Sequence, residues 1–257
     1  MLPPGTFEGR CVAVTGAGSG LGQHIALSLG ALGAEVALIG RRVEPLEETR
    51  ALIRADGGVG ECWPLDVRDR DQVEAAFSDI AARWGPVRHL VNSAAGNFRA
   101  APEEITPNGW AAVTKIVLDG SWNCTQVMGR DLIAAGVGGS VVSIGSAKAH
   151  SGSPDTVHSA SAKAGVLAMM KSLALAWGAH GIRLNTVSPG VTADTEAARR
   201  LFGDETALQR DIDRVPLARH AVRHEVSDAV TYLLSDFANY ITGTELAIDG
   251  GRSLAGA

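Results

Sequence analysis

The chain has 257 residues, of which 46% are hydrophobic and 20% are charged, and its formal net charge is −5. This composition is typical of a folded globular domain and excludes a disordered protein, and the acidic balance argues against a nucleic-acid-binding surface. Because no apolar run reaches the ~18 residues of a bilayer-spanning helix and the N-terminus lacks the features of a signal peptide, we expect a cytoplasmic protein that binds no membrane.

Short apolar runs alternate with helical patterns along the chain. The runs lack polar alternation, as do strands that are buried on both faces of a parallel sheet. We therefore predict an α/β fold in a single domain, residues 1–257, with one doubly wound, Rossmann-type parallel sheet of about seven strands and helices on both faces. The predicted elements in chain order are a strand at 11–16, a helix at 20–33, a strand at 35–40, a helix at 43–57, a strand at 59–67, a helix at 70–85, a strand at 87–96, a helical region at about 100–135, a strand at 139–146, a helix at 159–178, a strand at 182–190 and a short strand at 244–249.

A glycine-rich segment, TGAGSGLG at residues 15–22, follows the first predicted strand and opens the first helix. In this context it indicates a dinucleotide-binding loop, because Gly16 permits a sharp turn, Gly20 lets the backbone approach a pyrophosphate and Gly22 allows close helix packing. The helix N-terminus offers N–H donors to the anion, so Ser19 and Leu21 are also candidate cofactor-binding residues. The alternative is a purely structural glycine turn.

The end of the second predicted strand selects the cofactor. Enzymes that use NAD usually place an acidic residue there, whereas the 2′-phosphate of NADP favours arginine. This strand ends without an acid and is followed by Arg41 and Arg42. A guanidinium binds phosphate through two parallel hydrogen bonds, so we predict NADP(H) as the cofactor. The alternative is a pair of solvated arginines at the start of a helix.

Several motifs occur together in the order and spacing of the short-chain dehydrogenase/reductase family, which the whole chain resembles. They are TGAGSGLG, Asp66 in LDV, NSAAG at 92–96, Ser146, Lys163 and SPG at 188–190. The resemblance implies a substrate lid around 192–215 and a homotetramer formed through the helices at about 100–135 and 159–178. It also implies cofactor contacts from Asp66 and Val67 at the adenine, Asn92 and Ala94 on the adenosine side, Lys163 at the nicotinamide ribose, and Pro189, Gly190 and Val191 at the nicotinamide carboxamide.

The chain departs from the usual active site of this family, which is Asn–Ser–Tyr–Lys with the tyrosine four residues before the lysine. Ser146 and Lys163 are present, but the tyrosine position holds Ser159 and the asparagine position holds Val117. The only tyrosines, Tyr232 and Tyr240, lie in the C-terminal part of the chain, so neither is an obvious substitute.

The loss of the tyrosine has a specific chemical consequence. Reduction of a ketone needs a proton at oxygen, which a phenol near a lysine can supply and an ordinary serine hydroxyl, a far weaker acid, supplies poorly. A serine can still donate a hydrogen bond. That suits a reaction in which hydride arrives at a carbon remote from the oxygen, and the oxygen only needs its developing charge stabilised.

Within the family, the chain resembles the 2,4-dienoyl-CoA reductases, which also carry serine four residues before the lysine and use NADPH to form 3-enoyl-CoA. The segments that carry this resemblance are NSAAGNF, TPNGW, KIVLDG and HSASAKAGVLAMMKSLALAWG, and ADTEAARRLFG resembles the peroxisomal branch. The resemblance implies an acyl thioester substrate, on CoA or acyl carrier protein, and a role in fatty acid metabolism.

The residues that hold the substrate oxygen in those enzymes differ here. The mitochondrial type has asparagine at the position of Asp119 and tyrosine at about Lys148, and the peroxisomal type has an acid at the position of Leu167. We predict that Lys148 stabilises the enolate as a cation, with Asp119 beside it. The alternative is a solvated loop lysine and a helix-surface aspartate.

Other residues near these motifs carry weaker predictions. His150 and His158 could deliver a proton, Arg199 and Arg200 could meet carrier phosphates, and Phe98, Trp110 and Trp122 could line an acyl pocket; each could equally be an ordinary loop, surface or core residue. The three scattered cysteines favour buried free thiols, and no cluster has the spacing of a metal site.

Two other functions remain open from the sequence. One is a carbonyl or alcohol oxidoreductase, similar to a 3-oxoacyl reductase, with a proton donor other than tyrosine. The other is a cofactor-binding pseudoenzyme that acts as an assembly partner, which the missing asparagine and tyrosine would suit.

Overall fold

The computed structural model describes residues 2–193 and 205–255, and within them seven parallel strands form one sheet in the order β3-β2-β1-β4-β5-β6-β7. This confirms the predicted fold class. β1 lies between β2 and β4, so the direction in which successive strands are added to the sheet reverses at β1. A crevice therefore forms at the carboxyl ends of β1 and β4. The strands are β1 (Cys11–Thr15), β2 (Glu35–Gly40), β3 (Val59–Pro64), β4 (His89–Asn92), β5 (Gly139–Ile144), β6 (Ile182–Pro189) and β7 (Glu245–Ile248).

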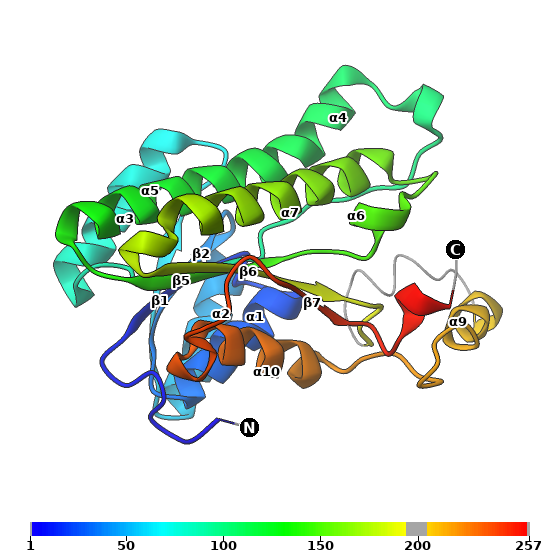
Figure 1. Ribbon diagram of the computed structural model, residues 1–257. Helices are drawn as coiled ribbons and strands as arrows, with labels where there is room; N and C mark the ends of the chain where they lie inside the picture. Colours follow the sequence, from blue (N-terminus) through cyan, green and yellow to red (C-terminus); the bar gives the residue numbers. More distant parts are fainter. Residues whose placement is uncertain (1, 194–204, 256–257) are drawn as a thin grey trace.

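Helices cover both faces of the sheet, in three layers (Figure 1). One face carries α1 (Gly20–Ala31), α2 (Val43–Ala55) and α10 (Arg223–Leu234), and the other carries α3 (Arg70–Trp84), α4 (Pro107–Thr114), α5 (Gly120–Ala135) and α7 (Val157–Trp177). The shorter elements are α6 (Lys148–Ser151), α9 (Glu205–Ile212), the π-helical turn η2 (Lys115–Asp119) and the 3-10 turns η1 (Pro102–Glu104), η3 (Gly178–His180), η4 (Asp236–Ala238) and η5 (Arg252–Leu254).

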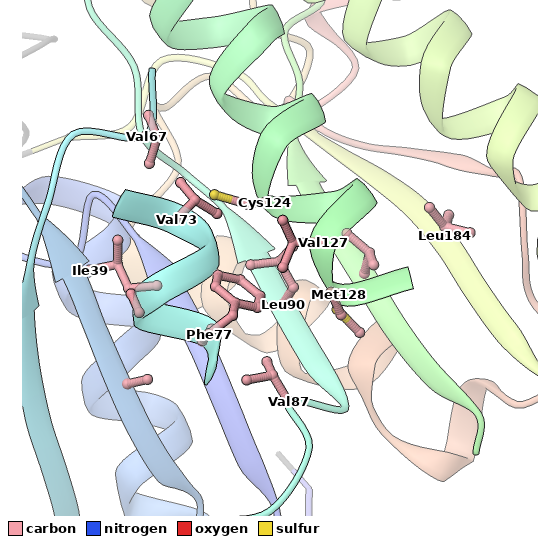
Figure 2. Close-up of a cluster of buried hydrophobic side chains, with 14 of the residues drawn as sticks. Ile39, Val67, Val73, Phe77, Val87, Leu90, Cys124, Val127, Met128 and Leu184 are labelled. Carbon is pink, nitrogen blue, oxygen red and sulfur yellow. The ribbon is translucent and has the colours of Figure 1, made fainter. Parts of the chain in front are cut away.

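Each face of the sheet has its own hydrophobic core. Figure 2 shows part of the core beneath α3 and α5, where Phe77, Leu90 and Val127 pack together. The second core lies beneath α1 and α10 and includes Ile25 and Val230. Apolar side chains on both faces explain why the strand sequences lack polar alternation.

The structure changes the bounds of several predicted elements. β4 ends at Asn92 rather than Gly96, because the backbone leaves the sheet there and forms a loop over its carboxyl edge. The helical region at 100–135 consists of α4 and α5 with η2 between them, and α7 begins at Val157, two residues before the predicted start. All three cysteines are unpaired; Cys11 and Cys124 are buried, and Cys62 is partly exposed. Among the described residues, no helix is long and apolar enough to cross a bilayer.

Candidate active site

The glycine-rich loop connects β1 to α1 at the crevice. Gly16 has a φ of +69°, which favours glycine, and a Cβ on Gly22 would overlap the carbonyl oxygen of Gly16, so no other residue fits there without displacing the turn. The hydroxyl of Thr15 accepts hydrogen bonds from the main-chain N–H groups of Ser93 and Ala94, each at 3.0 Å. These bonds hold the loop after β1 against the loop after β4.

An open cleft of about 680 Å³, continuous with solvent, lies beside this loop. It brings together most of the predicted adenosine-side residues: Gly16, Ser19, Arg41, Arg42, Asp66, Val67 and Ala94. Gly20, Leu21 and Gly22 form the first turn of α1 behind it. The Asn92 side chain lies elsewhere, buried in the interior, where its Nδ2 donates to Thr125 Oγ1 at 2.8 Å and to Ser143 Oγ at 3.2 Å. Asn92 thus supports the sheet beneath the cleft.

The charges along the cleft fit a phosphorylated adenosine. Arg41 and Arg42 are exposed and, among the described residues, neither makes an ion pair or a side-chain hydrogen bond. Arg68 donates from Nε and Nη2 to the Asp66 carboxylate, and these hydrogen bonds hold the pKa of Asp66 below its usual value. Asp66 is therefore an ionised acceptor, and two uncommitted guanidinium groups lie close by. This arrangement can hold a 2′-phosphate next to an adenine amine.

The predicted catalytic residues Ser146, Ser159 and Lys163 gather at the end of β5. Lys163 Nζ donates to the carbonyl oxygen of Ile144 at 2.5 Å, two residues before Ser146. Ser159 lies one turn before Lys163 on α7, so the two side chains share a helix face. Burial lowers the pKa of Lys163 to about 8, because the charged ammonium is largely removed from water.

The asparagine position of the family holds an apolar side chain, and neither tyrosine of the chain lies near the missing tyrosine's position. Val117 is 1% exposed within η2, and its carbonyl oxygen accepts a hydrogen bond from Ser121 Oγ at 2.6 Å. Tyr232 lies on α10, across the sheet from α7, and Tyr240 is fully exposed after that helix. These positions agree with the prediction that neither tyrosine takes the place of the missing catalytic tyrosine.

The structure describes both residues of the predicted Lys148–Asp119 pair, and their interaction stays a prediction. Asp119 is exposed at the end of η2, and within the described residues no ion pair joins it to Lys148 on α6. The charge of Lys148 contributes to a lowered pKa of Asp155. Burial alone would raise this pKa, but the Ser153 hydroxyl, Arg99 and Lys148 together lower it.

The structure distinguishes the two candidate histidines. His150 is more than half exposed and its Nε2 lies 2.5 Å from Glu245 Oε2. His158 is fully buried beneath Phe98, with 4.3 Å between the ring centroids, and in the described part of the chain neither ring nitrogen makes a hydrogen bond of normal geometry. Burial lowers the pKa of His158, which the main chain of Phe98 partly offsets, so this imidazole is neutral.

Some predicted residues are only partly placed. Arg199 and Arg200 lie outside the described residues, as does most of the predicted lid before α9. Phe98, Trp110 and Trp122 are each about 40% exposed, so none is a buried core residue. Sequence reasoning missed Arg68, although it directly follows the LDV motif, and Glu245, whose partners lie far away in the chain.

Comparison with known proteins agrees with this geometry. Residues 16–253 match a family model described as "Enoyl-(Acyl carrier protein) reductase". A Bacillus subtilis protein described as "Probable 2,4-dienoyl-CoA reductase [(2E)-enoyl-CoA-producing]" is 38% identical over 96% of this chain and 98% of its own length. D-threitol dehydrogenase from Mycolicibacterium smegmatis is 35% identical over 96% of this chain and 94% of its own.

A solved structure is also similar over almost the whole chain. It comes from an Agrobacterium tumefaciens protein crystallised with bound NADP, has a TM-score of 0.90 and 33% identity, and covers 98% of this chain and 99% of its own. The matched fold, glycine loop and lysine-bearing helix lead to one conclusion. The chain belongs to the short-chain dehydrogenase/reductase family, a family of oxidoreductases that bind nicotinamide cofactors.

Proposed function

We propose that this protein reduces a conjugated 2,4-dienoyl, or enoyl, thioester with NADPH. The observation that carries the proposal is the set of side chains around Lys163: Ser159 replaces the proton-donating tyrosine, and a buried Val117 replaces the asparagine. Such a site is poorly equipped to protonate an alkoxide. It can still stabilise an enolate through hydroxyl hydrogen bonds.

The residues of the chain have distinct parts in this reaction. When bound, NADPH would supply the hydride for the far alkene carbon of the substrate, and the task of the chain would be to stabilise the enolate charge that develops at the thioester oxygen. The hydroxyls of Ser146 and Ser159 donate hydrogen bonds to that oxygen. Lys163 holds the nicotinamide ribose as an ammonium, and water then protonates the substrate carbon.

Three features support NADP(H) as the cofactor. Arg41 and Arg42 line the cleft without committed partners among the described residues, β2 ends without an acid, and a structural relative at 33% identity binds NADP. The remaining cofactor contacts in the proposal are those of the loop at 16–22, of Asp66 and of Pro189 to Val191.

The decisive experiment measures NADPH loss with 2,4-dienoyl-CoA, with 3-oxoacyl-CoA as a parallel substrate. We expect turnover of the dienoyl thioester and little of the ketone. The product needs structural analysis, because the Bacillus relative is described as producing a 2-enoyl product, whereas a Caenorhabditis elegans relative is described as producing a 3-enoyl product. Robust reduction of 3-oxoacyl-CoA without turnover of the dienoyl thioester would refute the proposal.

The second candidate function is a carbonyl or alcohol oxidoreductase, which the similarity to D-threitol dehydrogenase favours. In that case Lys148, a histidine or water must donate the proton that tyrosine normally supplies. Oxidation of polyols with NADP or NAD, in the absence of dienoyl-CoA activity, would select this function.

The proposal extends to the protein's partners and organisation. It includes a CoA or acyl-carrier-protein thioester as substrate, a cytoplasmic location in fatty acid metabolism, and one cofactor-binding domain, residues 1–257, with a lid around 192–215. It also includes a homotetramer, which the exposure of Trp122 on α5 and Leu175 on α7 supports.

A further inference from the structure

A chain of hydrogen bonds connects three elements beside Ser146. Glu245, the first residue of β7, accepts a hydrogen bond from Ser188 Oγ on β6 at 2.5 Å, and its other oxygen lies 2.5 Å from His150 Nε2 on α6. Ser188 is buried, and the Glu245 side chain is only 17% exposed. One carboxylate therefore joins the sheet to the segment after β5.

The two partners of Glu245 contact the segment that carries Ser146 at different places. Ser188 packs against its start, and His150 belongs to its end. At the near end, a Cβ on Gly145 would overlap Ser188 Oγ, so the backbone of Gly145 rests directly on that hydroxyl. At the far end, His150 belongs to α6. Between them, the hydroxyl of Ser146 accepts a hydrogen bond from the main-chain N–H of Lys148 at 3.3 Å. The orientation of the Ser146 hydroxyl thus depends on where α6 lies.

α6 is too short to be stable without contacts to other elements. It has four residues, and a single helical turn is unstable in isolation because its hydrogen bonds do not offset the entropy of ordering it. None of its residues is fully buried. Its contact with Glu245 is a short hydrogen bond to a carboxylate that is only 17% exposed, although the His150 end of the bond is 57% exposed.

We propose that Glu245 is a positioning residue for the active site: by binding Ser188 and His150 together, it fixes the segment from Gly145 to Ser151 and aims the Ser146 hydroxyl at the substrate oxygen. This inference rests on the proposed function. Stabilisation of a developing oxyanion requires donors held at hydrogen-bonding distance before the reaction, and small displacements of such groups cost up to about a hundredfold in rate. Glu245 contributes this placement without touching the substrate.

The activity test compares three variants in the full-length protein. Glu245→Ala removes both hydrogen bonds, and we expect kcat with 2,4-dienoyl-CoA to fall about tenfold or more, while the Kd for NADPH, measured by fluorescence titration, changes less than about twofold. Glu245→Gln keeps an acceptor for Ser188 and a donor for His150, so it should recover part of that loss. Glu74→Ala is the matched control, because Glu74 also has two partners, Arg70 and Arg130, but lies on α3 away from the site; it should match the wild type.

A second measurement does not depend on turnover. Hydrogen–deuterium exchange of the protein with NADP should show faster exchange of the amides at 146–152 in Glu245→Ala, with Glu74→Ala unchanged. If Glu245→Ala does not fold, Ser188→Ala and His150→Ala each remove one bond and should each accelerate the same amides. The proposal would be overturned if Glu245→Ala, Ser188→Ala and His150→Ala all matched the wild type in kcat and in exchange at 146–152.

The two proposals fail in different ways. If the wild type does not reduce dienoyl thioesters but exchange at 146–152 still depends on Glu245, the substrate assignment is wrong and the positioning role stands. If dienoyl reduction is robust and the Glu245 variants retain it, only the positioning role is wrong.

Discussion

At the residue scale, the site differs from its family in which groups can give up a proton. Ser159 and Ser146 are hydroxyl donors with ordinary acidity, and Lys163 is the one titratable group of this trio. Its pKa of about 8 places a change of charge close to physiological pH. A site of this kind stabilises negative charge better than it transfers protons, and this fits enolate chemistry.

The role of Arg41 can be tested with a cofactor comparison. Arg41→Ala removes a guanidinium that lines the cleft and has no committed partner in the described part of the chain, so the 2′-phosphate should lose about 1.5–3 kcal/mol of binding free energy. We expect the Kd for NADPH to rise by more than about tenfold and that for NADH to change little. Equal losses for both cofactors in a fluorescence titration would contradict NADPH selectivity.

Lys163 gives the pH dependence a definite sign. Its pKa of about 8 lies below the ordinary value of 10.5, so the ammonium form is present below pH 8 and is lost as the pH rises through that value. Because the ammonium donates hydrogen bonds to the cofactor ribose in our proposal, kcat/KM should fall above about pH 8. Lys163→Arg, which stays charged, should retain weak activity without this decline; a decline at the same pH in both proteins would assign it to another group.

At the element scale, the packing of α5 against α7 holds the catalytic helix in place. Gly129 on α5 lies directly against the indole ring of Trp177 at the end of α7, and a Cβ there would overlap the ring. The helical region that the sequence predicts as one element contains the π-helical turn η2 just before α5. Such turns occur often at functional sites, and this one carries Val117 and Asp119.

A methyl group tests this packing. Gly129→Ala should lower the free energy of unfolding by about 1–3 kcal/mol, because the rigid indole ring cannot move aside without displacing its neighbours. Gly178→Ala is the control: its φ is −56° and an added Cβ would meet no heavy atom within 4 Å, so its stability should stay within about 0.5 kcal/mol of the wild type. Urea denaturation measures both. Equal stability of the two variants would show that α5 and α7 adjust freely.

At the scale of the whole molecule, α5 and α7 each expose a large apolar side chain. Leu175 on α7 is 89% exposed and Trp122 on α5 is 43% exposed. Exposed apolar groups on neighbouring helices favour association of copies of the chain. The proposed homotetramer would cover them.

Analytical ultracentrifugation tests this assembly. We expect a species of four times the chain mass of 26.6 kDa, and Leu175→Glu should shift it to smaller species. Leu52→Glu is the control, because Leu52 is an exposed leucine, at 49%, that lies on α2 across the sheet; it should leave the mass unchanged. A wild-type protein that sediments as a monomer would exclude the tetramer.

Much of the fold and of the cofactor cleft is readable from local sequence. The apolar runs, the loop at 15–22 and the arginines after β2 each act within a few residues, and the sheet brings their ends together because the carboxyl ends of parallel strands meet at one edge. The replacement of tyrosine by Ser159 is likewise visible without a structure, since four residues along a helix set its position relative to Lys163.

Tertiary packing decided the rest of the site. His150 and Glu245, which are separated by 95 residues in the chain, are in contact. His158, which the sequence treats like His150, is buried under Phe98. No local pattern encodes such pairs, because which side chains meet depends on how distant elements pack. Short sequence motifs therefore determine which chemical groups the site contains. The positions of those groups are set only by the packing of β6, β7 and α6.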